Sequence, residues 1–557
     1  MNKALEIKQT PAGQQDLFGE TPEIQISIKE AAEFASVSQA TIRNWIKAGN
    51  IHQAPSGLVI KNSLADFKRN EIGKKKLTAR ANKSSKDTHN HDDASLQIQG
   101  KINSECFDSD ALSSEYESSL SDSYRNKEGI YYTPPSIVAN LFDIRRDEIG
   151  SATFCDPCCG SGNFLVHAIN LGFKPENIYG FDTDANAISI AKKRIYAATG
   201  VEPKNIKCAD FLSEAAKNSA PQFDVIYTNP PWGKKIQKEQ KEQYGLIFGA
   251  GRALDTSALF FFACIRSLKE GGRLGLLLPD AFFNIATFEE ARIRISKLGL
   301  LRIVDYGKAF KGLISKAIGI SLLNIGRTEA PPIVTCESAG GKYERSSASF
   351  TKNPKTIFNY WCSPEENDVI LRAYSTPHST LAGHCNWGLG VVTGDNDKFC
   401  RPTQGDGCIP VFRGADIGKG TIAEPSCYIP SDLTLYQQVA PRPVYEAKEK
   451  IIYKFITNKL GFFHDTEQRY VLNSANILIA RESLGISTGQ LCDLLNSDFM
   501  DWLFLKLFST HKVLRGDLEQ LPIYVDYFRT NTIFHEDSFL EFLSIERTDN
   551  GTYRTKR

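Results

Sequence analysis

The sequence predicts a doubly wound α/β domain that is flanked by a small helical module and a mixed α+β domain. Strand-like and helix-like patterns alternate between residues 128 and 328, which is typical of a parallel sheet covered by helices. A short pair of amphipathic segments precedes this region, and the alternation is lost after about residue 350. The chain has 557 residues, more than one hydrophobic core usually serves.

Residues 1–70 are predicted to form a winged helix-turn-helix. Apolar residues of segment 26–51 share one face of each of two helices: Ile28, Ala31, Ala32 and Phe34 on the first, and Ile42, Trp45 and Ile46 on the second. The segment resembles the helix-turn-helix of excisionase-like and MerR-like DNA readers, which would direct Arg43 and Lys47 toward a major groove. A helical module that docks on the main body is the alternative.

Residues 71–125 are predicted to be a flexible polar linker. A basic run, "GKKKLTARANKSSK", is followed by Asp, Ser, His and Asn with few large apolar residues. Such a composition cannot bury enough apolar surface to offset the entropy of ordering the chain.

Residues 126–345 are predicted to form the α/β domain. Seven strands are expected along the chain: "ATFCD", "NIYGFD", "NIKCAD", "FDVIYTN", "GRLGLLLP", "LRIVDYG" and "AIGISLLNI". Amphipathic helices such as "ANAISIAKKRIYAATG" and "TSALFFFACIRSLKEGG" lie between them and are expected to end at their glycines.

The turn in "FCDPCCGSGNF" (154–164) joins a strand to the start of a helix. Gly160 and Gly162 allow the backbone to approach a ligand closely, and the helix N-terminus presents free N–H groups. A dinucleotide-binding turn has three glycines beside a diphosphate, whereas this turn carries Asp156, which would repel that group. The turn therefore favours a sulfonium cofactor with an α-ammonium group.

Acidic residues also end the next two strands. Asp182 lies about 20 residues beyond the glycines, where an acidic side chain typically accepts hydrogen bonds from ribose hydroxyls. Asp210, in "CADF", is expected near an adenine edge. A helix N-cap is the alternative for each aspartate alone, but strand ends of a parallel sheet share one edge.

The stretch "DVIYTNPPWGKK" (224–235) ends the fourth strand with an unusual tetrad. Asn229 supplies a side-chain carbonyl, while Pro230 and Pro231 lack N–H groups that would compete for neighbouring carbonyls. Two such acceptors can hold both hydrogens of a planar amine and free its lone pair to attack a sulfonium methyl group. Trp232 offers a face on which a planar ring can stack.

Over roughly residues 125–525, the chain resembles the γ-class adenine-specific DNA methyltransferases of bacterial restriction–modification systems, including the TaqI-like and Eco57I-like enzymes. The matching motifs occur in the γ order: "GIYYTPPSIV", "DPCCGSGNF", "GFDTD", "ADF" and "NPPW". Many relatives have tyrosine where Trp232 stands, so the stacking face is kept and a hydroxyl is lost.

The resemblance implies a Rossmann-like sheet that binds S-adenosyl-L-methionine. The implied cofactor residues are Tyr132, Thr133, Asp156, Cys158, Gly160, Gly162, Asp182, Asp210, Phe211 and Asn229. The implied catalytic residues are Asn229, Pro230, Pro231 and Trp232, with the target base stacked on Trp232 and on Phe310 in "YGKAFKGLISKAIGISLLNI".

Residues 346–557 are expected to be the target-recognition domain. The stretches "GLGVVTGDNDKF", "VFRGADI", "LLNSDFMDWLF" and "LRGDLEQLPI" are similar to the TaqI-like C-terminal specificity domain. The candidate DNA contacts are Arg413, Lys454, Lys459, His511 and Arg515, and for each of them a plain surface cation is the alternative.

The resemblance implies methyl transfer to the 6-amino group of adenine in double-stranded DNA by base flipping, which would protect host DNA from a separate cognate endonuclease. Protein glutamine and RNA adenine methylation are alternatives that use a similar tetrad. Cytosine ring methylation needs a cysteine after proline, and Cys158 fits this pattern only in the cofactor turn. An inactive regulator is disfavoured by the intact acidic residues, and no region suits a fused nuclease.

Bulk composition adds three expectations. The net charge of +1 argues against a binder that relies mainly on charge, although a local basic groove remains compatible with it. The 13 irregularly spaced cysteines and the absence of a secretory pattern favour reduced thiols in the cytoplasm, without a metal site. We expect no membrane partner, because the apolar runs are too short to span a bilayer, and we expect a monomer.

Overall fold

The computed structural model describes residues 25–35, 42–43, 45–46, 51–54, 56–70, 108–120, 125, 128–310, 313, 315–326, 329, 332–457, 459–508 and 512–556. The chain divides into two compact units: Met1–Asn103 with Ser118–Tyr124, and Ser104–Glu117 with Arg125–Arg557. Within the described ranges, no helix is both long enough and apolar enough to cross a membrane.

The first unit has a small core of its own. Helices α1 (Ile28–Ala35) and α3 (Lys61–Asn70) accompany the antiparallel pair of strands β1 (Gln25–Ile26) and β2 (Val59–Ile60). Trp45 packs edge-on against Phe67. Phe34 was expected on the buried face of α1, but it is 37% exposed and Ala35 is buried instead. The helical repeat explains this, since positions 28, 31, 32 and 35 share a face.

The turn and most of the second helix expected in this unit lie outside the described residues, as does Lys47. Arg43 is exposed, in agreement with the predicted outward orientation. The helix-turn-helix itself stays a prediction.

Part of the expected linker is instead helical. Helix α5 (Ser109–Ser119) buries Leu112, Tyr116 and, just beyond its end, Leu120. These three side chains recur every four residues and so form an apolar stripe. Composition averaged over the whole segment hides such a stripe. The rest of the expected linker, apart from residues 108, 120 and 125, lies outside the described residues.

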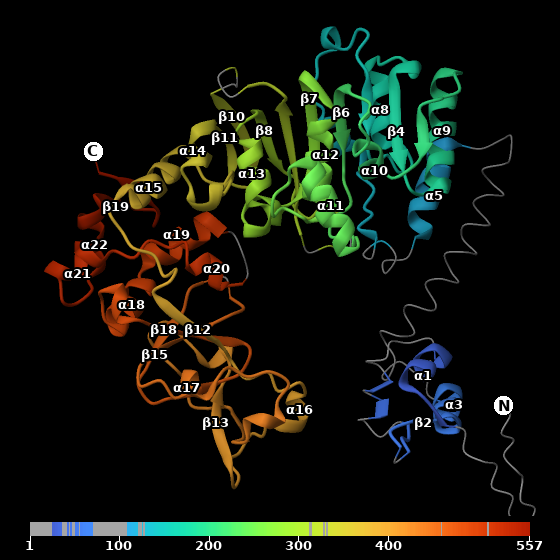
Figure 1. The fold of residues 1–557 in the computed structure, drawn as a ribbon. Helices are drawn as coiled ribbons and strands as arrows, with labels where there is room; N and C mark the ends of the chain where they lie inside the picture. Colours follow the sequence, from blue (N-terminus) through green and yellow to red (C-terminus); the bar gives the residue numbers. More distant parts are fainter. Residues whose placement is uncertain are drawn as a thin grey trace, which may run out of the picture. The chain divides into compact units, whose positions relative to one another are not determined.

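The second unit contains a sheet whose described strands number nine, in the order β11-β10-β8-β9-β7-β6-β3-β4-β5 (Figure 1). All seven predicted strands are present and are parallel except β9, which lies antiparallel between β7 and β8. β10 and β11 extend the sheet beyond the prediction. The bounds are β3 (Phe154–Asp156), β4 (Ile178–Asp182), β5 (Ile206–Cys208), β6 (Phe223–Thr228), β7 (Leu268–Pro279), β8 (Gly299–Asp305), β9 (Ala317–Leu323), β10 (Ile333–Ser338) and β11 (Gly341–Ser346).

Helices cover both faces of this sheet, so it is doubly wound as predicted. One core joins the sheet to α7 (Pro135–Leu141), α8 (Asn163–Leu171) and α9 (Ala185–Thr199). The other joins it to α10 (Phe211–Ala215), α11 (Lys238–Phe248), α12 (Thr256–Arg266) and α13 (Glu289–Ile295). α9 ends at Gly200 as expected. α12 ends at Arg266 rather than at the predicted glycines, because Leu268–Pro279 already pairs as β7.

The C-terminal part mixes strands and helices, as predicted. Its described strands form two small sheets and a hairpin: β12 (Cys385–Leu389), β18 (Ala475–Ala480), β15 (Lys450–Lys454) and β16 (Phe462–Asp465); β14 (Cys427–Pro430), β13 (Cys408–Phe412) and β17 (Tyr470–Val471); and β19 (Ile545–Arg547) with β20 (Tyr553–Thr555). Its helices are α14 (Ser347–Thr351), α15 (Pro364–Ser375), α16 (Asn396–Phe399), α17 (Arg442–Tyr445), α18 (Thr488–Leu495), α19 (Asp498–Phe508), α20 (Arg515–Leu518), α21 (Val525–Thr530) and α22 (Glu536–Leu543). Side chains of β15 and β18 enter two separate cores, so this sheet is buried on both faces.

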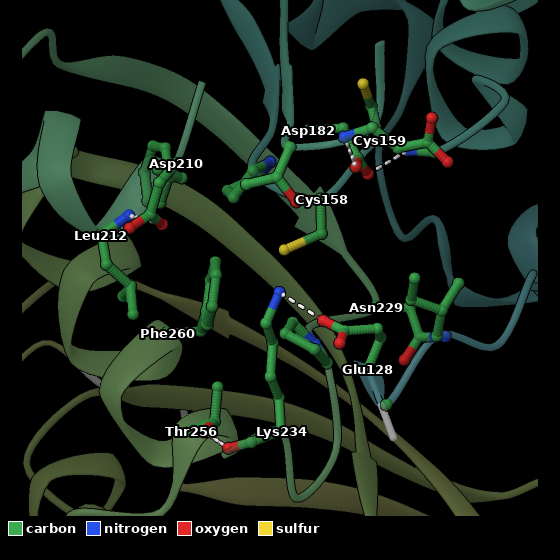
Figure 2. A pocket seen from close by; sticks show the side chains of 18 of the residues that line it. Glu128, Cys158, Cys159, Asp182, Asp210, Leu212, Asn229, Lys234, Thr256 and Phe260 are labelled. Atoms are coloured by element: carbon green, nitrogen blue, oxygen red, sulfur yellow. Dashed lines mark hydrogen bonds and ion pairs between the residues drawn. The ribbon is translucent and has the colours of Figure 1, made fainter. Parts of the chain in front are cut away.

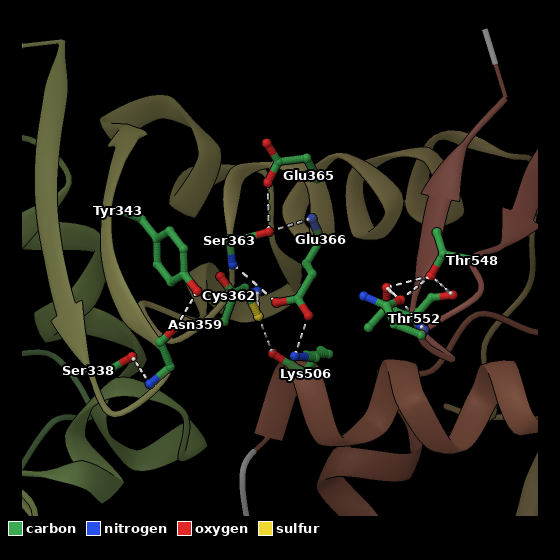
Figure 3. Close-up of polar contacts among 12 residues, drawn as sticks. Ser338, Tyr343, Asn359, Cys362, Ser363, Glu365, Glu366, Lys506, Thr548 and Thr552 are labelled. Carbon is green, nitrogen blue, oxygen red and sulfur yellow. Dashed lines mark hydrogen bonds and ion pairs between the residues drawn. The ribbon is translucent and has the colours of Figure 1, made fainter.

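The start of α15 is tied to the end of α19 (Figure 3). Ser363 and Glu366 form a reciprocal cap at the N-terminus of α15. Glu366 also pairs with the Lys506 ammonium at 2.6 Å, and the Cys362 thiol donates to the Lys506 carbonyl at 3.3 Å. Helices distant in sequence are thereby joined within the C-terminal part.

Candidate active site

A cavity of about 340 Å³ lies at the carboxyl ends of β3, β4, β5 and β6 (Figure 2). This is the edge of an open α/β sheet where ligands usually bind, and the volume lies in the usual range for ligand sites. The cavity brings together most of the residues predicted from sequence: Tyr132, Thr133, Cys158, Gly160, Asp182, Asp210, Phe211, Asn229 and Pro231.

Asp182 is held at the cavity wall by backbone donors. Its Oδ2 accepts from the N–H of Gly160 at 2.9 Å, and its Oδ1 accepts from the N–H of Asp184 at 2.9 Å. Burial raises the pKa of Asp182, and the two N–H groups oppose that rise. Gly160 has a φ of +49°, and a Cβ there would lie 2.9 Å from the Tyr132 ring. The turn therefore needs glycine for both conformation and space.

Asp156 and Gly162 support the cavity without lining it. The Asp156 carboxyl is fully buried, and its Oδ1 accepts from the Cys158 N–H at 3.0 Å. Burial raises the pKa of Asp156 to about 7, although the Thr228 hydroxyl and the Cys158 N–H oppose this. Gly162 is the N-cap of α8 at a φ of +94°. Asp156 Oδ2 is buried and has no hydrogen-bond partner among the described residues, and the placement of this carboxyl beside a bound cation stays a prediction.

Asp210 both lines the cavity and caps α10, so the alternative considered from sequence also holds. Its Oδ1 accepts from the Leu212 N–H at 3.1 Å, and its Oδ2 accepts from the Ser213 hydroxyl at 3.1 Å. Phe211 follows it, and Phe260 of α12 lines the same part of the cavity. These residues form an acidic and aromatic end of the site.

Asn229 presents one end of its amide to the site. Its Nδ2 donates to the backbone carbonyl of Tyr131 at 2.7 Å. Its Oδ1 is buried and has no hydrogen-bond partner among the described residues. An unpartnered buried acceptor is costly, which favours a ligand donor at that position. Pro231 lines the cavity, whereas Pro230 is buried behind it.

The aromatic face expected for base stacking is covered. Trp232 is 9% exposed, and its indole N–H donates to the Leu277 carbonyl at 3.2 Å. Phe310 is 6% exposed and meets Trp232 edge-on at 5.4 Å between ring centroids. Tyr131 lies 5.5 Å from Phe310 and 6.1 Å from Trp232. The three rings pack on one another, so the predicted stacking partners are together but closed.

Several cavity residues were missed from sequence. Lys234 pairs with Glu128 at 3.0 Å, and the Thr256 hydroxyl donates to the Lys234 carbonyl at 2.6 Å (Figure 2). On the outer side of the loop, the Glu117 carboxylate of α5 accepts from the Ser161 hydroxyl at 2.7 Å. Tyr116 bonds to Asp184 in the same region.

Cys158 lines the cavity as a neutral thiol. Burial raises its pKa well above the usual value, and the carboxyl groups of Asp156 and Asp182 raise it further. A nucleophilic cysteine needs a thiolate, so this environment disfavours the cytosine-type mechanism. The twelve cysteines within the described ranges are free, and these ranges contain no cluster that could hold a metal.

The predicted DNA contacts lie on separate elements of the C-terminal part. Arg413 is exposed after β13, Lys454 is half-buried in β15, and Lys459 is exposed. Arg515 bonds to Glu519 at 2.8 Å and stacks over Trp387 at 5.5 Å. His511 lies outside the described residues. Arg515 therefore has intramolecular partners, and all of these DNA contacts stay predictions.

Two family models match the chain. One, described as N-6 DNA Methylase, matches residues 107–298, and one described as TaqI-like C-terminal specificity domain matches residues 409–523. The first match includes α5 and the whole cavity edge, and the second includes β13 to α20.

Individual proteins agree with these matches. The chain is 46% identical over 397 residues to the type II methyltransferase M.VspI of a Vibrio species, covering 71% of this chain and 96% of that protein. It is 24% identical to the type II methyltransferase M.HindII of Haemophilus influenzae, over 49% of this chain and 55% of the relative. The solved structure of the type IIL restriction–modification enzyme MmeI in complex with DNA has a TM-score of 0.50 and 13% identity, covering 74% of this chain and 70% of that one. That last likeness is one of fold.

Proposed function

This chain belongs to the N6-adenine DNA methyltransferases of type II restriction–modification systems, and from this we propose how its cavity performs the transfer. The cofactor of these enzymes, S-adenosyl-L-methionine, supplies the methyl group. We assign the polar end of the cavity to the cofactor and Asn229 with its neighbouring carbonyls to the target amine.

The residues present fit this cofactor. Each Asp182 oxygen has one N–H donor and keeps lone-pair capacity for the ribose hydroxyls. Asp210 is positioned to accept from the adenine 6-amino group, with Phe211 and Phe260 beside the purine. The Tyr132 ring closes over Gly160 at the other side. Asp156 holds the turn by accepting from the Cys158 N–H, and the neutral Cys158 thiol lines the cavity.

The unpartnered Oδ1 of Asn229 is the observation that carries the catalytic assignment. It accepts one hydrogen of the target 6-amino group, and a proline carbonyl of the tetrad accepts the other. This arrangement would draw the nitrogen lone pair out of conjugation and lower the barrier without a strong base. As the N–C bond forms, the C–S bond of the cofactor would break and the amine would release one hydrogen as a proton. The anchor to Tyr131 keeps the acceptor end of the amide turned toward the substrate.

The test is transfer of labelled methyl from S-adenosyl-L-methionine to unmethylated plasmid DNA, followed by nucleoside analysis. Label is expected in N6-methyladenine, and Asn229→Ala is expected to lower the rate at least about 100-fold. Asn550→Ala, in the turn between β19 and β20, is the matched control and is expected to keep the rate. Asn229→Ala with an unchanged rate would overturn the assignment.

The finer parts of the biological role are also proposals. Chemistry on a stacked base requires the adenine to be flipped out of double-stranded DNA. Methylation then protects host DNA from a separate cognate endonuclease. We further propose that the enzyme acts in the cytoplasm as a monomer, because methylating one adenine at a time needs no two-fold axis.

A second candidate function concerns the N-terminal unit, which we propose represses the enzyme's own promoter through its helix-turn-helix. Two observations support this: the unit has a separate core, and its segment Met1–Asn103 lies outside both family matches. Deleting residues 1–70 should abolish promoter binding in a gel-shift assay while plasmid methylation continues. Unchanged promoter binding after the deletion would contradict this role.

A further inference from the structure

The segment that follows the tetrad forms one wall of the cavity. Its lining residues are Lys234, Lys235, Ile236, Gln237, Gln240 and Tyr244. Close packing holds α11 in place, since a Cβ on Gly245 would lie 2.5 Å from Leu254 Cδ2. Gly249, at a φ of +68°, ends the helix. Tyr244 is buried and packs in the core beneath, so its hydroxyl has a fixed position.

That hydroxyl lies within a polar network around Asp210. It is 2.8 Å from the Ser213 hydroxyl and 3.5 Å from Asp210 Oδ2. The Gln240 amide N–H donates to the Tyr244 oxygen at 3.2 Å, which directs the tyrosine proton toward Ser213 and Asp210. Ser213 in turn donates to Asp210 Oδ2 at 3.1 Å. Two hydroxyl groups thus converge on Oδ2, while the α10 backbone occupies Oδ1.

We propose that Tyr244 is a positioning residue that makes the cofactor site select a 6-aminopurine. Hydroxyl donors to Oδ2 fix the rotamer of Asp210, and the one lone-pair site that remains, on Oδ1, then serves as the acceptor for the ligand. A purine that bears a 6-amino group donates to this site, and a purine that lacks the group leaves the acceptor unpaired. The inference rests on the proposed placement of the cofactor adenine beside Asp210.

Ligand binding to the full chain tests this without turnover. Calorimetry would compare S-adenosyl-L-homocysteine with its analogue in which hydrogen replaces the 6-amino group. The wild type is expected to prefer the amino ligand by about tenfold, the size of one good buried hydrogen bond. Tyr244→Phe should reduce this preference about threefold with affinity for the analogue unchanged, and Asp210→Ala should abolish it.

The results distinguish the role of Tyr244 from the placement of the cofactor adenine beside Asp210. If Tyr244→Phe lowers the affinity for both ligands equally, the positioning role is overturned, because the substitution then acts only through packing. Asp210→Ala that keeps the preference would overturn the adenine placement and the Tyr244 role together. Gln243→Ala, on the exposed face of α11, is the control and should leave both affinities unchanged. If Tyr244→Phe fails to fold, Ser213→Ala and Gln240→Leu remove the same network from its other members.

Discussion

The active site has two halves, one for the cofactor and one for the target base, at the ends of neighbouring strands. They differ in whether the ligand site is already open. In the cofactor half, Asp182 and Asp210 already hold backbone donors and line an open cavity. In the base half, Tyr131, Trp232 and Phe310 pack against one another, and Trp232 is bonded to β7. The cofactor half is therefore preformed, whereas a base flipped as proposed would first have to separate the aromatic rings.

The largest effect expected from the cofactor half is on the pH dependence of the free energy of unfolding. The raised pKa of Asp156 means that the folded state keeps its proton while the unfolded state loses it, so stability falls as pH rises from about 4 to about 7. Asp156→Asn should remove this dependence, about 3 kcal/mol between pH 5 and 8. Urea unfolding of both proteins at the two pH values measures it. Equal pH dependence in both would show that the buried carboxyl does not titrate there.

The next largest effect is on ligand affinity, and it tests whether Asp182 in the cofactor half holds the ribose. Asp182→Ala should raise the Kd for S-adenosyl-L-homocysteine about 100-fold, since two charged hydrogen bonds to ribose are lost. Calorimetry checks it, with Asp549→Ala on the exposed turn near the C-terminus as the control. A change of less than about threefold would move the ribose elsewhere and weaken the contrast between the halves.

A smaller effect tests the closed aromatic cluster. Phe310→Ala should make opening easier but remove a stacking face, so base binding should weaken about tenfold. The probe is DNA with 2-aminopurine at the target adenine, whose fluorescence rises when the base leaves the stack. Cofactor affinity should remain unchanged. Unchanged affinity of the variant for this DNA would mean that Phe310 only fills space.

The smallest effect concerns the ion pair at the rim of the cavity. Lys234 and Glu128 are partly exposed, so screening by solvent makes their pairing weak. Lys234→Ala is expected to change cofactor affinity by about threefold or less. A loss of tenfold or more would indicate that Lys234 contacts the cofactor directly, and the reciprocal Glu128→Ala variant would identify which partner matters.

Much of the cofactor half could be predicted because its determinants are local. Long apolar runs gave the seven strands, and the residues that end them gave Gly160, Asp182, Asp210 and Asn229. The prediction failed where a side chain's direction depends on tertiary packing. Asp156 is buried without lining the cavity, and α5 buries apolar side chains within a segment of polar composition. Tyr244 and Glu128 reach the cavity from elements whose sequences carry no site motif.

The anchored amide of Asn229 also determines which bases can bind, because only its acceptor end faces the site. An unanchored amide could rotate and offer either its oxygen or its nitrogen, and so accept from an amine or donate to a carbonyl. The bond from Nδ2 to the Tyr131 carbonyl removes the second option. An adenine that has been deaminated would place a keto oxygen against an oxygen, and repulsion would eject it. Under the proposed placement of the target base, one backbone carbonyl would thus let the enzyme reject a damaged base that is otherwise the same shape.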